Sequence, residues 1–442
     1  MSSTVEIPPS TATVSVSIIN TGWVRGIPCS KWFSPRFEGL DVFNMCSYAF
    51  LVTHEDAATG RRRRVLFDMG IRKDWQNVVP TWQRIFRDHA VELKVEKDVS
   101  EILAGGGVNL NDIEAMIWRF ADPSFTTYLP TFFMYLEASA DRAAKSHLHW
   151  DHIGNPTKFP ASTKLVVGPG FKEAFMPGWP GNLRAEFTQE DVAGRTIVEI
   201  SRPQFDVSVG GYPGYDYFGD GSFFILDAPG HVTGHINALA RTASEPESYI
   251  FMAGDSVHFG GELRPSAQVP LPCSRGADAV LPSPPLPRPC PGDLLLDMHP
   301  HHSPTTPYLS LGRSFPEDVA AADRTIRRLQ AFDADARVLV VFAHDEAFLP
   351  APDGGEEEEE NGKNENGDGD GDGDGEGGGE EEEGKARMIP QFPRPMDDWA
   401  TRKTRGGRSV KEAVRWTFLG ELYEIAVGRR RRMEEGEGEK GA

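Results

Sequence analysis

Residues 146–152 read SHLHWDH and place three histidines and one aspartate within seven positions. Alternate residues of an extended segment point to the same side, so His147 and His149 would face one point. Asp151 and His152 follow on a bend and would face a second point close by. Imidazole and carboxylate groups are common metal ligands, so this loop can serve two metal ions.

Three later segments add histidine or aspartate directly after short apolar runs that are typical of β-strands. They are PGHVTGH at 229–235, GD at 254–255 and AHD at 343–345. Such ligands bind a cation at only about 2.0–2.2 Å, so these strand ends would have to meet the SHLHWDH loop. We expect the last histidine of PGHVTGH, His235, to support the site by hydrogen bonding.

This ordered set of motifs resembles the metallo-β-lactamase superfamily, and LFDMG at 66–70 is similar to the strand-and-turn element early in that family. The resemblance runs from about Thr13 to Asp345. It implies a mixed α/β (α+β) fold, an αββα sandwich in which two mixed β-sheets lie face to face and helices flank them. The metal ions would lie at one edge of the sheets.

Carried over by position, the resemblance also implies a dinuclear centre. Seven side chains would bind the two ions: His147, His149 and His231 the first, Asp151, His152 and His344 the second, and Asp255 both. Zinc suits a histidine-rich set of ligands without cysteine, while iron, manganese and cobalt are alternatives. Two divalent ions sharing a water would generate a bridging hydroxide that attacks an acyl carbon. Asp151 or Asp255 would orient it and pass a proton to the leaving oxygen, and we favour Asp151.

Residues 255–266 and the Pro-rich stretch after them resemble the quorum-quenching N-acyl-homoserine-lactone lactonase branch of the superfamily. That branch has a tyrosine three residues after the bridging aspartate, where this chain has His258. The resemblance implies that this tyrosine helps to bind the substrate carbonyl. The imidazole of His258 would donate the same hydrogen bond, or the replacement indicates that the substrate is a different ester. Arg264 is expected to form a structural ion pair. The expected function is hydrolysis of a lactone or related ester; the alternatives are a glyoxalase-II-like thioesterase and a non-hydrolytic or inactive metal-binding protein.

Charge and composition narrow the choice of partner. The 442 residues carry a formal net charge of −20, but 353–384 alone contribute −15, which leaves −5 for the rest. A nearly balanced body has no strong field for gathering nucleic acid, so a small-molecule lactone or ester is the expected partner. The four cysteines form no CxxC pair, and the chain shows neither a secretory signal nor a membrane span, which favours a cytoplasmic protein. The oligomeric state stays open.

Composition also divides the chain. We expect five parts: a flexible N-terminus (1–12), a metallo-β-lactamase-like domain (13–350), a disordered acidic insertion (351–386), a C-terminal segment with a helix over 408–427 that packs back on the domain (387–428), and a charged tail (429–442).

One stretch interrupts the family pattern. Residues 119–145 separate the apolar run at 113–118 from SHLHWDH, and joining Trp118 to Ser146 would restore the expected strand-to-loop order. We therefore expect 119–145 to be an insertion, either a lineage-specific loop or an unspliced segment. In the rival interpretation, the apolar run at 131–136 forms the strand that leads into SHLHWDH.

Overall fold

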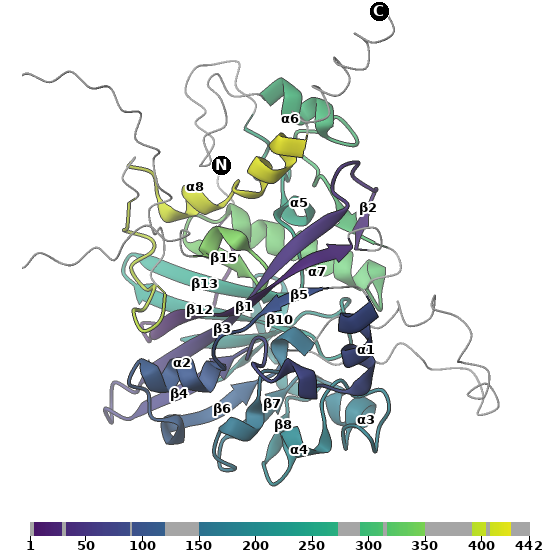
Figure 1. Cartoon of the computed structure of the whole chain (residues 1–442). Helices are drawn as coiled ribbons and strands as arrows, with labels where there is room; N and C mark the ends of the chain where they lie inside the picture. Colours follow the sequence, from purple (N-terminus) through teal and green to yellow (C-terminus); the bar gives the residue numbers. More distant parts are fainter. Residues whose placement is uncertain are drawn as a thin grey trace, which may run out of the picture.

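Two β-sheets occupy the middle of the molecule and helices lie outside them (Figure 1). The structure, a computed structural model, describes residues 4–28, 32–88, 91–119, 150–272, 292–312, 316–349, 391–403 and 407–425. Alternate residues of both sheets, such as Ile18, Phe50, Ile225 and Met252, share one buried cluster, so the sheets pack face to face. The predicted α/β sandwich is confirmed.

The first sheet has seven strands in the order β5-β1-β3-β4-β6-β7-β8. Their bounds are β1 Val14–Pro28, β3 Val42–Glu55, β4 Arg62–Phe67, β5 Glu92–Lys94, β6 Ile113–Ile117, β7 Lys164–Val167 and β8 Ile197–Glu199. The strands from β5 to β4 pair antiparallel, and those from β4 to β8 pair parallel. The short apolar runs of β6 and β7 suit parallel strands that are covered on both faces.

The second sheet has six strands in the order β15-β13-β12-β11-β10-β9. Their bounds are β9 Val207–Val209, β10 Tyr212–Asp216, β11 Phe223–Asp227, β12 Ile236–Ser244, β13 Glu247–Gly254 and β15 Val338–Phe342. Only β13 and β15 pair parallel, so their carboxyl ends lie side by side. A separate pair joins β2 (Phe33–Ser34) to β14 (Ser310–Leu311).

The α-helices of the described residues lie outside the two sheets (Figure 1). They are α1 Pro80–Asp88, α2 Val99–Gly105, α3 Phe171–Phe175, α4 Gln189–Val192, α5 Gly260–Leu263, α6 Gly292–Met298, α7 Val319–Ala334 and α8 Val410–Val414. The side chain of Asp318 caps α7 by accepting a hydrogen bond from the Ala321 amide. Near the carboxyl end of that helix, Phe332 packs against Tyr212 and Phe251 of the second sheet. None of the described helices is long and apolar enough to cross a membrane.

The structure tests only part of the prediction that 119–145 is an insertion after the strand at 113–118. β6 is buried and hydrogen-bonded between β4 and β7, as expected for the run at 113–118. The rival run at 131–136 lies outside the described residues, so the insertion remains a prediction. The acidic insertion and the charged tail also lie outside them.

The C-terminal segment differs in detail from the predicted single helix over 408–427. It contains α8 and a second helical stretch at 418–425, with a turn at 415–417 between them. The break turns two apolar groups in different directions. Val410 and Val414 belong to the buried cluster between the sheets. Leu419 and Leu422 belong to a second buried cluster, which includes the residues of the strands that face away from that space, such as Leu51 and Leu239.

Lys411 of α8 gives the first testable consequence. Its ammonium group is buried and donates hydrogen bonds to the carbonyls of Asp335 and Val338. Burial lowers the pKa of Lys411 from 10.5 to about 7. Between these values the unfolded chain binds a proton that the folded chain does not, so stability rises with pH. We expect Lys411 to contribute a gain of about 2 kcal/mol between pH 7 and pH 9.

The measurement is the free energy of unfolding in urea at both pH values. Lys411→Met should flatten this gain, whereas Lys403→Met, an exposed lysine of the same segment, should leave it unchanged. An equal gain in wild type and Lys411→Met would contradict the prediction.

Candidate metal centre

Strand ends from both sheets bring histidine and aspartate side chains together. Asp255 follows β13 and His344 follows β15, and the Ala343 amide donates to the Gly254 carbonyl at 3.1 Å, which holds these ends side by side. His231 follows β11 through a Pro-Gly turn. Gly230 of that turn has φ +127, and a Cβ there would lie 2.0 Å from the Ala322 amide nitrogen of α7, so the turn requires glycine.

The end of the SHLHWDH motif reaches the same point. Trp150–His152 form a single 3-10 turn, η6, which is bound to the first sheet. Ser47 donates to the Asp151 carbonyl at 2.7 Å, and the Met69 amide donates to the His152 carbonyl at 3.3 Å. These bonds place Asp151 and His152 beside the end of β4. His147 and His149 lie outside the described residues, so their position is not part of this geometry.

Four of the predicted ligands form a compact cage. Ligands bound at 2.0–2.2 Å to a tetrahedral ion lie about 3.4 Å from one another. Here His152 Nε2 is 3.1 Å from an oxygen of Asp151 and 3.1 Å from an oxygen of Asp255. His344 Nε2 is 3.0 Å from Asp255 and 3.7 Å from Asp151. The spacing of these four groups fits one divalent cation between them.

Asp151 supports this fit independently. Both of its carboxylate oxygens are buried, and no described residue donates a hydrogen bond to either. A buried carboxylate without a donor is costly, and a bound cation removes that cost. His344 Nδ1 donates to the Cys46 carbonyl at 2.8 Å, which turns the lone pair of Nε2 toward Asp151 and Asp255. The chemistry of the group is thus that of a metal ligand set.

A second group lies next to this cage. His231, Asp255 and His258 each offer an atom within 4.8 Å of the others, and all three side chains are buried. The ring centroids of His231 and His258 are 5.0 Å apart, and the Trp32 ring meets His258 edge-on at 5.2 Å. His258, predicted to contact the substrate carbonyl, therefore stands beside the position of the first ion. In this place it can serve as a ligand as well as a hydrogen-bond donor.

Asp68 was not identified as a site residue by sequence analysis, although it lies in LFDMG. It has φ +64, and one of its oxygens accepts the amides of Met69 and Gly70 at 2.6 and 2.9 Å. The other oxygen is 2.9 Å from Nδ1 of His152, which directs Nε2 of that ring toward the cage. Burial acts to raise the pKa of the Asp68 carboxyl, but His152 and Arg119 hold it below its ordinary value.

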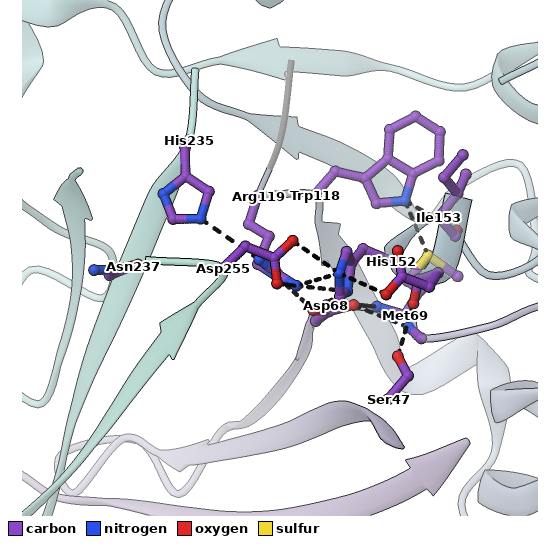
Figure 2. A network of polar contacts seen from close by, with 12 residues as sticks. Ser47, Asp68, Met69, Trp118, Arg119, His152, Ile153, His235, Asn237 and Asp255 are labelled. Atoms are coloured by element: carbon purple, nitrogen blue, oxygen red, sulfur yellow. Dashed lines mark hydrogen bonds and ion pairs between the residues drawn. The ribbon is translucent and has the colours of Figure 1, made fainter. Parts of the chain in front are cut away.

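Arg119 is the second residue that sequence analysis did not place in the site. Its side chain is 1% exposed, and its guanidinium lies among the predicted ligands (Figure 2). Nε is 2.5 Å from Asp68, and Nη2 is 3.1 Å from Asp255 and 2.6 Å from both ring nitrogens of His152. His235, expected to support the site, has Nε2 3.5 Å from Nη1 of Arg119 and Nδ1 3.1 Å from the Ala228 carbonyl.

The chain has sequence relatives that are named as hydrolases. No family model matches the chain. It is 34% identical over 348 residues to the Gamma-lactamase FDB1 of Fusarium pseudograminearum (strain CS3096), covering 77% of this chain and 76% of that protein. It is 36% identical over 344 residues to the Metallo-hydrolase mfmC of Annulohypoxylon moriforme, covering 77% and 80%. A shorter match, 35% over 106 residues, joins it to the N-acyl homoserine lactonase AttM of Rhizobium johnstonii (strain DSM 114642 / LMG 32736 / 3841), covering 23% and 36%.

The solved structures that resemble the chain include a quorum-quenching N-acyl homoserine lactone hydrolase. That match is 15% identical, covers 76% of this chain and 93% of the other, and has a TM-score of 0.43. The sandwich and the cluster of histidine and aspartate at its edge define a metallo-hydrolase. With the extended match to mfmC, they show that the chain belongs to the metallo-β-lactamase superfamily.

Proposed function

We propose that the chain opens a lactone or cleaves a related ester at a centre that holds two divalent ions, which we take to be zinc. The observation that carries the proposal is the cage of Asp151, His152, Asp255 and His344, whose ligand spacing suits one cation. The cluster of His231, Asp255 and His258 adjoins it and shares Asp255. His147 and His149 complete the proposed set for the first ion.

The names of two relatives support acyl hydrolysis of a ring, since one is a lactonase and the other a γ-lactamase. The γ-lactamase match spans most of both chains, so opening of a γ-lactam is a second candidate function. The proposed partner is a small-molecule substrate, and the proposed location remains the cytoplasm. Thioester hydrolysis, as in glyoxalase II, is the alternative to be tested beside them.

The residues of the chain would divide the chemistry among them. When bound, the ions would lower the pKa of a water molecule and polarise the substrate carbonyl. Asp151, whose oxygens face the cage without a protein donor, would receive a proton from that water and deliver it to the leaving group. His258 would donate a hydrogen bond to the substrate carbonyl. Its neighbour Trp32, which is buried, meets the imidazole edge-on.

The test combines elemental analysis with a substrate panel on the purified full-length protein. We expect zinc, and hydrolysis of N-acyl-homoserine or other γ-lactones faster than of γ-lactams and thioesters. Asp151→Asn should lower kcat by about 10²–10⁴-fold, the usual contribution of a general acid-base group. Asp216→Asn, at the end of β10 and outside the centre, is the matched control. Preference for thioesters, or metal without any hydrolysis, would overturn the proposal.

A further inference from the structure

Arg119 leaves β6 at the point where the family pattern would lead directly into SHLHWDH. Backbone bonds on both sides hold it there. The Trp118 amide donates to the Val166 carbonyl of β7 at 2.9 Å, and the Ile236 amide of β12 donates to the Arg119 carbonyl at 3.2 Å. The arginine is therefore anchored to both sheets, and its side chain has to run into the space between their ends.

The guanidinium is tightly enclosed in that space. A Cβ on Gly254 would lie 2.6 Å from Nη1 of Arg119, so the strand end before Asp255 touches the arginine directly. Asp68 and Asp255 supply two negative charges at 2.5 and 3.1 Å. Figure 2 shows Arg119 between these carboxylates, with His152 on one side and the His235 ring directed toward it on the other. The guanidinium is a buried positive charge at the edge of the metal cage.

The groups that Arg119 contacts are the ones that the second ion requires. Asp255 Oδ1 accepts from Arg119 and also lies 3.0 Å from His344 Nε2. Nη2 lies 2.6 Å from both ring nitrogens of His152, so an ion bound by Nε2 at about 2.0 Å would lie no more than about 4.6 Å from this positive charge. Two like charges this close in a buried site repel strongly, because little water screens them.

We propose that Arg119 is an internal cation that competes with the metal ion for His152 and Asp255. The second ion would then bind weakly, and only as the guanidinium withdraws, so this chain would fill its two positions at very different concentrations of free metal. The inference rests on the proposed dinuclear centre. It concerns metal affinity, which can be measured without any knowledge of the substrate.

The test is a titration of metal-free full-length protein with Zn²⁺ against a chromophoric chelator. Wild type should bind two ions in two separate steps. Arg119→Ser should tighten the weaker step by at least about tenfold, the scale on which groups next to metal ligands change affinity. Arg119→Lys, which keeps the charge, should stay close to wild type. Arg241→Gln is the matched control, because Arg241 is a buried, ion-paired arginine at the far end of β12.

Two results would overturn the inference. One is wild-type protein that binds both ions with equal, tight affinity, and this outcome needs no variant to fold. The other is Arg119→Ser that retains its native circular dichroism spectrum and the wild-type affinity for both ions. Hydrolysis is assayed separately with saturating metal. Inactivity toward every ester would reject the proposed function but not the competition, and an active enzyme with unchanged affinities would reject only the competition.

Discussion

Asp255→Asn should lower hydrolysis at least about a thousandfold and reduce the bound metal to less than one ion per chain. Asp255 lies within 3.0–3.6 Å of nitrogens of His152, His231 and His344, three histidines from different segments. Asparagine keeps the shape of the side chain but removes the charge that would bind both ions. Stabilisation by a metal ion is worth several kcal/mol, and each 1.36 kcal/mol is a factor of ten in rate.

The control for this variant is Asp227→Asn. Asp227 also ends a strand of the second sheet, but it pairs with Arg202 and lies in neither ligand group. Metal content by elemental analysis and kcat/KM on the best ester of the panel should remain at wild-type values in this control. An Asp255→Asn protein that keeps two ions, or loses less than tenfold in rate, would show that Asp255 does not hold the centre.

Much of the fold follows from local patterns in the sequence. The runs at 64–67, 113–117, 164–167, 223–226 and 338–342 are mostly apolar, and all form strands in the structure. Because the sandwich brings the ends of such strands to one edge, motifs far apart in sequence predict one cluster. The structure does bring Asp151, His152, His231, Asp255 and His344 together. Their binding of metal remains a proposal.

The parts that the sequence did not predict depend on contacts between distant segments. Asp68 orients His152 because a left-handed turn aims its carboxylate, and nothing in LFDMG alone indicates which ring it meets. Arg119 belongs to no motif, and its charge enters the centre only because both sheets hold its backbone. A signal existed for Arg119, since it directly follows the apolar run at 113–118, where the expected strand-to-loop order would place Ser146.

Arg264, unlike Arg119, is a charged residue near the motifs that stabilises the fold and does not contact the ligand groups. As expected from the sequence, it forms an ion pair: Nε and Nη2 contact the two oxygens of Asp333 at 3.0 and 2.9 Å. Both side chains are buried, and Nη1 also donates to the Arg415 carbonyl at 2.6 Å. The pair therefore joins α5, α7 and the C-terminal segment, and it does not face the ligand cage.

Asp333→Asn should lower the free energy of unfolding by about 3–5 kcal/mol, because it leaves the buried guanidinium of Arg264 without its counter-charge. The exposed pair of Arg64 and Asp112 provides the control, since Asp112→Asn should cost less than about 1 kcal/mol. Both values come from urea unfolding near neutral pH. A loss for Asp333→Asn as small as that of the control would show that the pair contributes nothing beyond a surface contact.

The pH dependence of this contribution has a definite sign. Burial acts to raise the pKa of Asp333, but Arg264 and Arg415 outweigh it and hold the pKa well below the ordinary value of 3.8. A carboxyl with a lowered folded-state pKa stabilises the protein above its unfolded-state pKa and loses this effect as the pH falls toward the folded-state value. In a Lys411→Met background, where the lysine whose pKa of about 7 also depends on the Asp333 charge no longer titrates, the effect of Asp333→Asn should therefore be constant from pH 8 to pH 5 and shrink only in strong acid. A difference that already declines between pH 7 and pH 5 would mean that another group, titrating near neutrality, controls the junction.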